Sequence, residues 1–243
     1  MDHIFIFYTL LIIVAFLYAS VGHGGASGYL ALMALFSFAP AVMKPTALLL
    51  NLFVSAISFY QFYRGKHFLW KIFLPLAMAS VPMAYLGGTI HLEAGVYKKI
   101  LGLFLLIPVT RFVLFPNIAV TDQRPSSFAW SLLIGGAIGF FSGLIGIGGG
   151  IILSPILLLL KWTDQKQTAA ISALFIFVNS SSGLAGQFKN GIEFTTNMYW
   201  CVGLAVIGGC CGAYLGALKF NQLILKNILA GVLLLAAVKL FFT

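Results

Sequence analysis

The chain has 243 residues, of which 61% are hydrophobic and only 8% are charged, with a formal net charge of +9 at neutral pH. Soluble domains carry about 25% charged residues, so this composition and the mean hydropathy of +1.05 exclude a soluble domain. Several apolar runs reach the ~20 residues that a membrane-spanning helix needs. We therefore expect one compact all-α integral membrane protein in contact with the lipid bilayer.

Ten helices are predicted in two sets of five. The first set is Ile4–Val21, Ala26–Ala39, Thr46–Tyr63, Phe68–Ile90 and Val96–Phe115. The second set is Ala129–Ile145, Ile151–Leu160, Thr168–Phe188, Thr195–Leu218 and Leu223–Phe242. A polar linker, residues 116–128, separates a first repeat, residues 1–115, from a second repeat, residues 129–243.

Sequence matches between the two halves indicate a duplication. Gln61 and the glycine four residues later recur as Gln187 and Gly191. Because five helices per half is an odd number, the second copy enters the membrane from the opposite side. If the first two helices of each half instead form a hairpin that turns back at mid-depth, three spanning helices remain and the inversion is kept. The predicted fold is therefore two inverted-topology repeats, each a helical hairpin plus three spanning helices.

The basic residues predict an orientation in the membrane. More lysines and arginines fall at the end that contains Lys66 than at the end that contains Lys189. Cytoplasmic loops carry the excess of positive charge, so the Lys66 end is predicted to be cytoplasmic and both termini outside. This loop bias also accounts for the net positive charge, and no nucleic-acid partner is expected.

Two glycine clusters are the candidate substrate sites. The second cluster is Gly146, Gly148, Gly149 and Gly150, and the first is Gly22, Gly24 and Gly25. Three consecutive glycines cost about 1 kcal/mol each in a helix interior, and non-helical backbone within a membrane is tolerated where it lines a cavity or is buried in protein. Each cluster opens a helix that is too short to span, whose N-terminal N–H groups and dipole favour an anion.

Further polar residues at membrane depth are candidates for lining the site. They lie on the third and eighth helices. Their hydroxyls and amides can bind an anion or form hydrogen bonds to neighbouring helices. The two glutamines can gate a pathway or cap helices. His23 is the one ionisable residue placed inside the membrane, as an anion receptor, a proton carrier or a neutral structural group. The predicted substrate-binding set is Gly22, His23, Gly24, Gly25, Ser27, Asn51, Ser55, Gln61, Gly146, Gly148, Gly149, Gly150, Asn179, Ser181, Ser182 and Gln187.

Other glycines are spaced for close helix packing. They recur every four residues, a spacing that lets membrane helices approach each other closely. We expect a packing role for Gly135, Gly139, Gly143, Gly208, Gly212 and Gly216.

The motif Gly146-x-Gly148-Gly149-Gly150 followed by Pro155, in a duplicated bundle of this length, resembles the TauE/SafE sulfite exporter family. The resemblance implies a multi-pass transporter of the bacterial inner membrane that exports sulfite, thiosulfate, sulfoacetate or related organosulfonates. It implies no catalytic residue, metal or cofactor, and it leaves assembly as a homodimer open. The first cluster departs from the motif, with His23 at the variable position and Ala26 in place of the last glycine.

Two alternatives remain at this point. One is a carrier of another small anion or of a lipid-linked metabolite with the same architecture. The other is an intramembrane serine protease, because Gly25-Ala26-Ser27-Gly28 spells a G-x-S-G motif. That reaction would need a histidine base brought to Ser27 from another helix.

Overall fold

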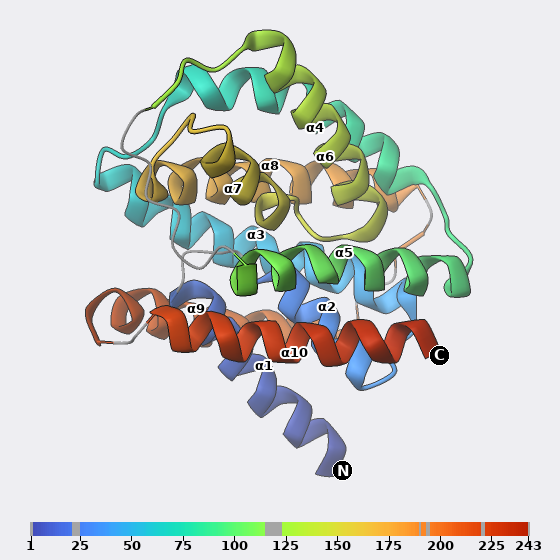
Figure 1. The fold of residues 1–243 in the computed structure, drawn as a ribbon. Coiled ribbons are helices and arrows are strands. Elements are labelled where there is room, and N and C mark those ends of the chain that lie inside the picture. Colours follow the sequence, from blue (N-terminus) through green and yellow to red (C-terminus); the bar gives the residue numbers. More distant parts are fainter. Residues whose placement is uncertain are drawn as a thin grey trace.

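The computed structural model describes residues 2–20, 25–114, 123–189, 191–192, 195–219 and 222–242, and these form ten helices. In chain order they are α1 (Asp2–Ser20), α2 (Ala26–Leu35), α3 (Pro40–Arg64), α4 (Trp70–Thr89), α5 (Ala94–Leu114), α6 (Phe128–Ile145), α7 (Gly150–Leu159), α8 (Gln165–Phe188), α9 (Thr196–Lys219) and α10 (Gln222–Phe242). Figure 1 shows their arrangement. The all-helical fold and the ten helices predicted from the sequence are confirmed.

The boundaries differ most between the second and third helices. The sequence predicts a second helix that reaches Ala39 and a third that starts at Thr46, whereas α2 ends at Leu35 and α3 begins at Pro40. Ser37 turns the chain between them with a φ of 60°. Pro40 suits the first turn of a helix because its fixed φ is helical and its missing N–H is not needed there. The prolines of the segment therefore lie within the start of α3.

Four described helices are long and apolar enough to cross a membrane by length and composition, namely α3, α4, α6 and α8. Large apolar side chains also point outward, among them Met78, Leu133 and Trp200. A lipid environment tolerates such a surface, and tryptophans are enriched near its polar boundaries. The outward side chains thus suit contact with lipid.

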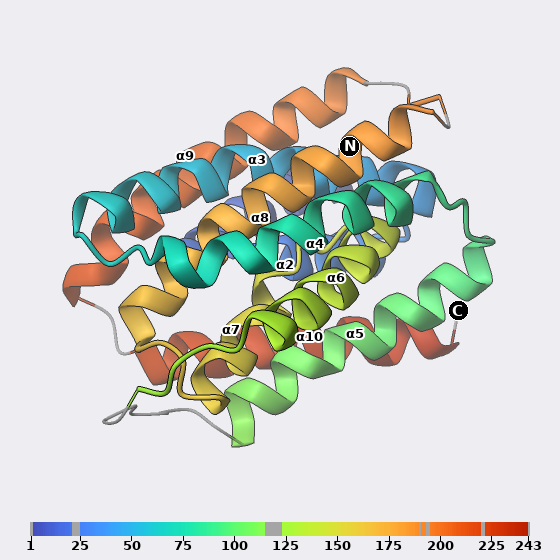
Figure 2. The ribbon, with the colours of Figure 1, turned by 90° about the horizontal axis from the view of Figure 1, so that it is seen from above.

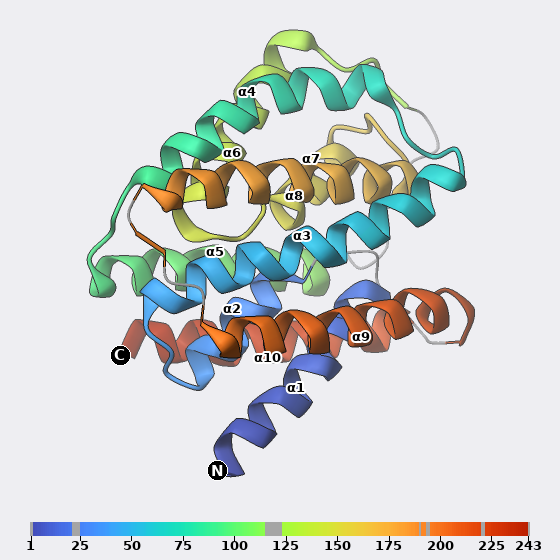
Figure 3. The same ribbon diagram turned by 180° about the vertical axis from the view of Figure 1, so that it is seen from behind.

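The helices are stacked in layers. Figure 1 shows α4 and α6 at one face, α10 toward the opposite face, and α3, α7 and α8 between them. The view from above shows α3, α8, α4 and α6 side by side (Figure 2). The view from behind shows α8 and α3 in the middle of the bundle (Figure 3). The helix contacts agree, because α8 packs against α3, α4, α6 and α7.

The central pair, α3 and α8, is antiparallel. Leu48 of α3 lies against Gly183 of α8, while Asn51, farther along α3, contacts Ser180, which comes earlier in α8. Because the contacts run in reverse order, the start of α3 lies beside the end of α8. This crossing brings residues far apart in the sequence to one end of the bundle.

Two other pairs are parallel and packed through glycine. In the α6–α4 pair, three glycines of α6 lie so close to α4 that an added Cβ would meet a backbone carbonyl. The contacts are Gly135 with Leu76, Gly139 with Ser80 and Gly143 with Ala84. In the α9–α1 pair, Gly208 lies on Ile12 and Gly212 on Phe16. The predicted packing role is confirmed for these five glycines, and the side-chain environment of Gly216 falls outside the described part.

Candidate functional site

The short helices α2 and α7 are matched in length and in the way they begin. Each has ten residues, or about 15 Å at ~1.5 Å per residue, half of a ~30 Å hydrocarbon core. Each follows a left-handed glycine, Gly25 with a φ of 85° and Gly149 with a φ of 79°, and neither glycine supplies a side-chain cap. The first N–H groups of a helix have no partner within the helix, so both N-termini offer donors.

The two glycine breaks meet in the folded chain. Gly25, Ala26 and Ser27 from the start of α2 line a small cavity together with residues around the second break and the neighbouring helices, Tyr18, Ile147, Ile151 and Ile176. Its volume is about 10 Å³, close to the least that one water molecule requires. The structure therefore places Gly25, the described residue of the first cluster, beside the second break, with only a small space between them.

The second break is a turn built from three left-handed glycines. Gly146, Gly148 and Gly149 have φ values of 92°, 76° and 79°, a region that costs other L-residues roughly 1–2 kcal/mol each. At Gly148 the neighbours leave no room either, because a Cβ would lie 2.5 Å from Asn51 Nδ2 and 3.1 Å from Ser180 Oγ. Conformation and close approach both require glycine here.

Two buried polar side chains, Asn51 and Ser180, lie against this turn, and α3 and α8 carry further buried polar groups at Ser55 and Asn179. Asn51 is fully buried, and its Nδ2 donates to Ser180 Oγ at 3.3 Å. Asn179 donates from Nδ2 to the carbonyl of Phe175 at 2.9 Å. Asn51 Oδ1, Asn179 Oδ1 and Ser55 Oγ are buried without a hydrogen-bond partner among the described residues. Buried polar groups are normally paired, and rotating an asparagine amide exchanges its acceptor and donors, so these groups can serve a ligand.

Two tyrosines complete the first break, and the sequence analysis did not single them out. The Tyr18 hydroxyl and Ser27 Oγ are 2.7 Å apart, and the Tyr29 ring covers Gly25, where a Cβ would lie 2.6 Å from the Tyr29 oxygen. Both tyrosines are fully buried, and the Tyr29 hydroxyl has no partner among the described residues. The sequence feature that could have identified them is a tyrosine in the apolar run on each side of the first glycine break. The described partner of Ser27 is thus a phenol and not an imidazole.

Some predicted site residues lie elsewhere. Ser181 Oγ donates to the Phe177 carbonyl and Ser182 Oγ to the Val81 carbonyl, so these hydroxyls serve α8 itself and its contact with α4. Gln61 is exposed, whereas Gln187 is buried and lines a different cavity. Gly22, His23 and Gly24 lie outside the described residues.

A bundle with long apolar helices and two short helices that begin at neighbouring glycine breaks is typical of membrane transporters with discontinuous helices. The family model described as Sulfite exporter TauE/SafE matches residues 7–240. The chain therefore belongs to the TauE/SafE family, and the resemblance carried by the glycine motif is confirmed. It is a multi-pass membrane transporter and not an enzyme, which removes the protease alternative.

Curated relatives agree with this assignment. The chain is 36% identical to "Probable membrane transporter protein y4hK" of Sinorhizobium fredii over 234 residues, which cover 95% of each chain. It is 28% identical to "Probable membrane transporter protein ORF9" of Sinorhizobium sp over 98% of this chain and 92% of the relative. It is 26% identical to "Probable membrane transporter protein YdhB" of Bacillus subtilis over 93% of this chain and 95% of the relative. No solved structure gives a significant match.

Proposed function

We propose that this transporter exports small sulfur-containing anions, such as sulfite, thiosulfate, sulfoacetate or related organosulfonates, across the bacterial inner membrane. The anion is held at mid-membrane between the N-termini of α2 and α7. The observation that carries this proposal is the meeting of two ten-residue helices, each opened by a left-handed glycine without a side-chain cap. Two converging N-termini direct N–H groups and positive dipole ends at one place.

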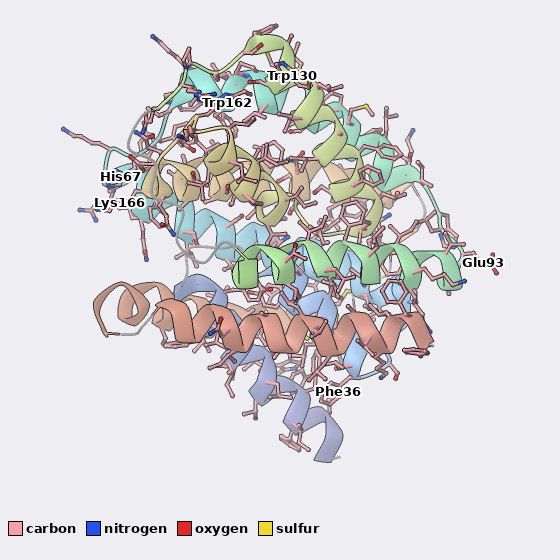
Figure 4. The ribbon with its side chains drawn as sticks, in the orientation of Figure 1. Phe36, His67, Glu93, Trp130, Trp162 and Lys166 are labelled. Carbon is pink, nitrogen blue, oxygen red and sulfur yellow. The ribbon has the colours of Figure 1, made fainter. Side chains whose placement is uncertain are left out.

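The distribution of acidic residues also favours an anion. Glu93 is exposed in the loop between α4 and α5, and Asp164 caps α8 by accepting from Lys166 N and Gln167 N. Figure 4 places Glu93 at one end of the bundle and Lys166 with His67 at the other. The described interior therefore holds no carboxylate that would repel an anion. Export can proceed without a coupled ion, because one negative charge leaving the cell gains about 2.3 kcal/mol per 100 mV.

The proposed binding residues comprise the two glycine clusters, His23, Ser27 and the buried amides and hydroxyl at Asn51, Ser55 and Asn179. The cavity of about 10 Å³ between the half-helices is too small for a sulfur oxyanion. Transport then requires the helices around the cavity to separate toward one side of the membrane at a time.

We further propose that the two halves are inverted repeats. In an inverted repeat, a helix of the first half and its counterpart in the second half run antiparallel. A pair of helices that are not counterparts occurs twice, and its two copies have the same relative direction. The antiparallel α3–α8 contacts support this, as does the α5–α10 pair, which runs in opposite directions in Figure 1. The α6–α4 and α1–α9 pairs, both parallel and both glycine-packed, are the repeated unlike pair.

Labelling of single cysteines tests the inversion. The native Cys201, Cys210 and Cys211 are first replaced by alanine, since two of them are exposed. Lys66→Cys and Lys189→Cys, both at exposed positions, are expected to react with an impermeant maleimide from opposite sides of the membrane. Lys66 lies after α3 and Lys189 after α8, and these helices run in opposite directions. Labelling of both positions from the same side would contradict the inverted repeat.

Flux into and out of proteoliposomes tests the substrate. Sulfite, thiosulfate and sulfoacetate are expected to cross membranes that contain the protein faster than empty liposomes, and lactate is expected not to. A sulfonate or sulfite group offers three oxygens to the converging N–H groups, whereas a carboxylate offers two. Flux of lactate alone, or of none of these anions, would favour the carrier of another anion or of a lipid-linked metabolite.

A further inference from the structure

A second, larger cavity lies at one end of the bundle, where the start of α3 meets the ends of α4, α6 and α8. Its volume is about 310 Å³, and Lys44, His91, Tyr97 and Gln187 are among the residues that line it. One water requires roughly 10–15 Å³ on this measure, so the cavity has room for many waters. The cavity is therefore large enough for a small anion that keeps part of its hydration shell.

The side chain of Lys44 contributes a positive charge to this cavity. Its Nζ lies 3.4 Å from the carbonyl oxygens of both Gly88 and Ile90 at the end of α4. Typical N–H···O distances are 2.9–3.0 Å, so both contacts are long, and an ammonium has three hydrogens to donate. The described part of the wall contains no carboxylate. With two long contacts and three hydrogens, the ammonium has donor capacity left for an anionic group in the cavity.

Gln187 contributes a donor that lacks an acceptor. Its side chain is only 4% exposed, and its Nε2 has no hydrogen-bond partner among the described residues. The antiparallel crossing of α3 and α8 is what places Gln187, near the end of α8, in the same cavity as Lys44, near the start of α3. A buried amide donor is normally paired, and an oxyanion in the cavity would pair it.

The cavity also adjoins the glycine turn. A Cβ on Gly146 would lie 3.1 Å from Lys44 Cγ and 3.1 Å from the Lys44 carbonyl oxygen. The Tyr97 hydroxyl donates to the Ile145 carbonyl, one residue earlier, at 2.8 Å. Two residues that line the cavity, Lys44 and Tyr97, therefore contact the chain where the glycine turn begins. The same turn contacts Asn51 at Gly148. An anion in the cavity is close to the start of that turn.

We propose that this cavity, the Lys44 cavity, is an exit site that binds the transported oxyanion after it leaves the space between α2 and α7, because the cavity lies at the Lys189 end of the bundle, which the sequence predicts to be outside. Lys44 supplies the charge and Gln187 supplies an N–H donor. The proposal rests on the proposed anion export, and it assigns to Lys44 and Gln187 the last contact with the substrate.

A simpler role for Lys44 must be separated from this one. A lysine beside the last carbonyls of a helix stabilises that helix end through its charge, and Lys44 lies beside the end of α4. Capping alone predicts that removing the charge lowers the melting temperature and leaves anion affinity unchanged. An exit site predicts that anion affinity falls.

The test measures equilibrium binding of radiolabelled thiosulfate and sulfite to the purified full-length protein in detergent, alongside initial flux rates in proteoliposomes. Lys44→Gln is expected to raise the Kd about tenfold or more, because hydrogen bonds to a charged donor are the strong ones, while Lys44→Arg keeps most of the affinity. Gln187→Glu is expected to weaken binding at least as much, since it places a carboxylate in the cavity with Lys44 still present. Lys99→Gln, at an exposed position on α5, is the control and is expected to leave the Kd within twofold.

The outcomes separate the two proposals. If the wild-type protein neither binds nor transports the probes, the proposed function fails. If it transports them and Lys44→Gln and Gln187→Glu both leave the Kd unchanged, the exit site alone is overturned. An equal loss in Lys99→Gln would also overturn it, because general surface charge would then explain the effect. Should Lys44→Gln fail to fold, Gln187→Glu and Lys44→Arg still decide the question.

Discussion

Replacing Gly148 with alanine is expected to reduce anion flux about tenfold or more while the protein still inserts into the membrane. The backbone there has a φ of 76°, and a Cβ would lie 2.5 Å from Asn51 Nδ2 and 2.9 Å from Ile176 Cγ2. The left-handed conformation alone costs alanine roughly 1–2 kcal/mol, and each 1.4 kcal/mol is about a factor of ten. The turn must move away from α3 and α8, which displaces the donors at the start of α7.

Two matched variants show whether this effect belongs to the turn. Gly231→Ala in α10 adds the same methyl group where no neighbour lies within 4 Å, so wild-type flux is expected. Gly212→Ala adds it against the Phe16 backbone of α1, so a loss of stability is expected with flux per folded molecule largely retained. Flux is measured per molecule of monodisperse protein. Equal flux in Gly148→Ala and Gly231→Ala would mean that the turn has no special role in transport.

Two glycines of one helix, α6, are expected to respond to alanine with opposite signs. A Cβ on Gly143 would lie against the Ala84 backbone of α4, which cannot rotate away, whereas a Cβ on Gly136 would meet Ala79 Cβ at 3.6 Å and Met83 Cγ at 3.8 Å. Overpacking typically costs about 1–3 kcal/mol, while alanine gains about 1 kcal/mol over glycine in a helix. Gly143→Ala is therefore expected to lower the melting temperature, and Gly136→Ala to leave it unchanged or raise it.

Thermal unfolding of the detergent-solubilised protein measures both variants. Because the two residues share a helix and receive the same methyl group, differences in insertion or helix propensity cancel. A lower melting temperature for Gly136→Ala than for Gly143→Ala would contradict the close parallel packing of α6 on α4.

The helices and their glycine contacts could be predicted because they depend on local pattern. Apolar runs interrupted by glycine and proline locate ten helices, and a four-residue glycine spacing identifies the α6 and α9 surfaces that pack closely. The cluster from Gly146 to Gly150 could be identified as a helix break because so many glycines in one helix are unfavourable. The matched lengths of α2 and α7 needed the structure, since the end of α2 is set by the turn at Ser37 and the start of α3 at Pro40.

The contacts across the bundle could not be predicted. Lys44 reads in the sequence as one more basic residue at a helix end, and only the antiparallel crossing of α3 and α8 places it in a cavity with Gln187. Ser181 and Ser182 read as site lining, yet their partners are the backbone carbonyls of Phe177 and Val81. A sequence shows that a hydroxyl is at membrane depth but not which side of its helix faces a neighbour.

The parallel packing of α1 on α9 has a consequence for how the protein is made. Gly208 and Gly212 lie on Ile12 and Phe16, so α1 gains this packing partner only after the residues between α1 and α9 have been synthesised. At about 5–20 residues per second, the roughly 200 intervening residues take ~10–40 s. During that interval α1 must be held in the membrane by lipid or by the insertion machinery. Because α1 packs on α9 and α4 packs on α6, assembly of each half must therefore wait for the other.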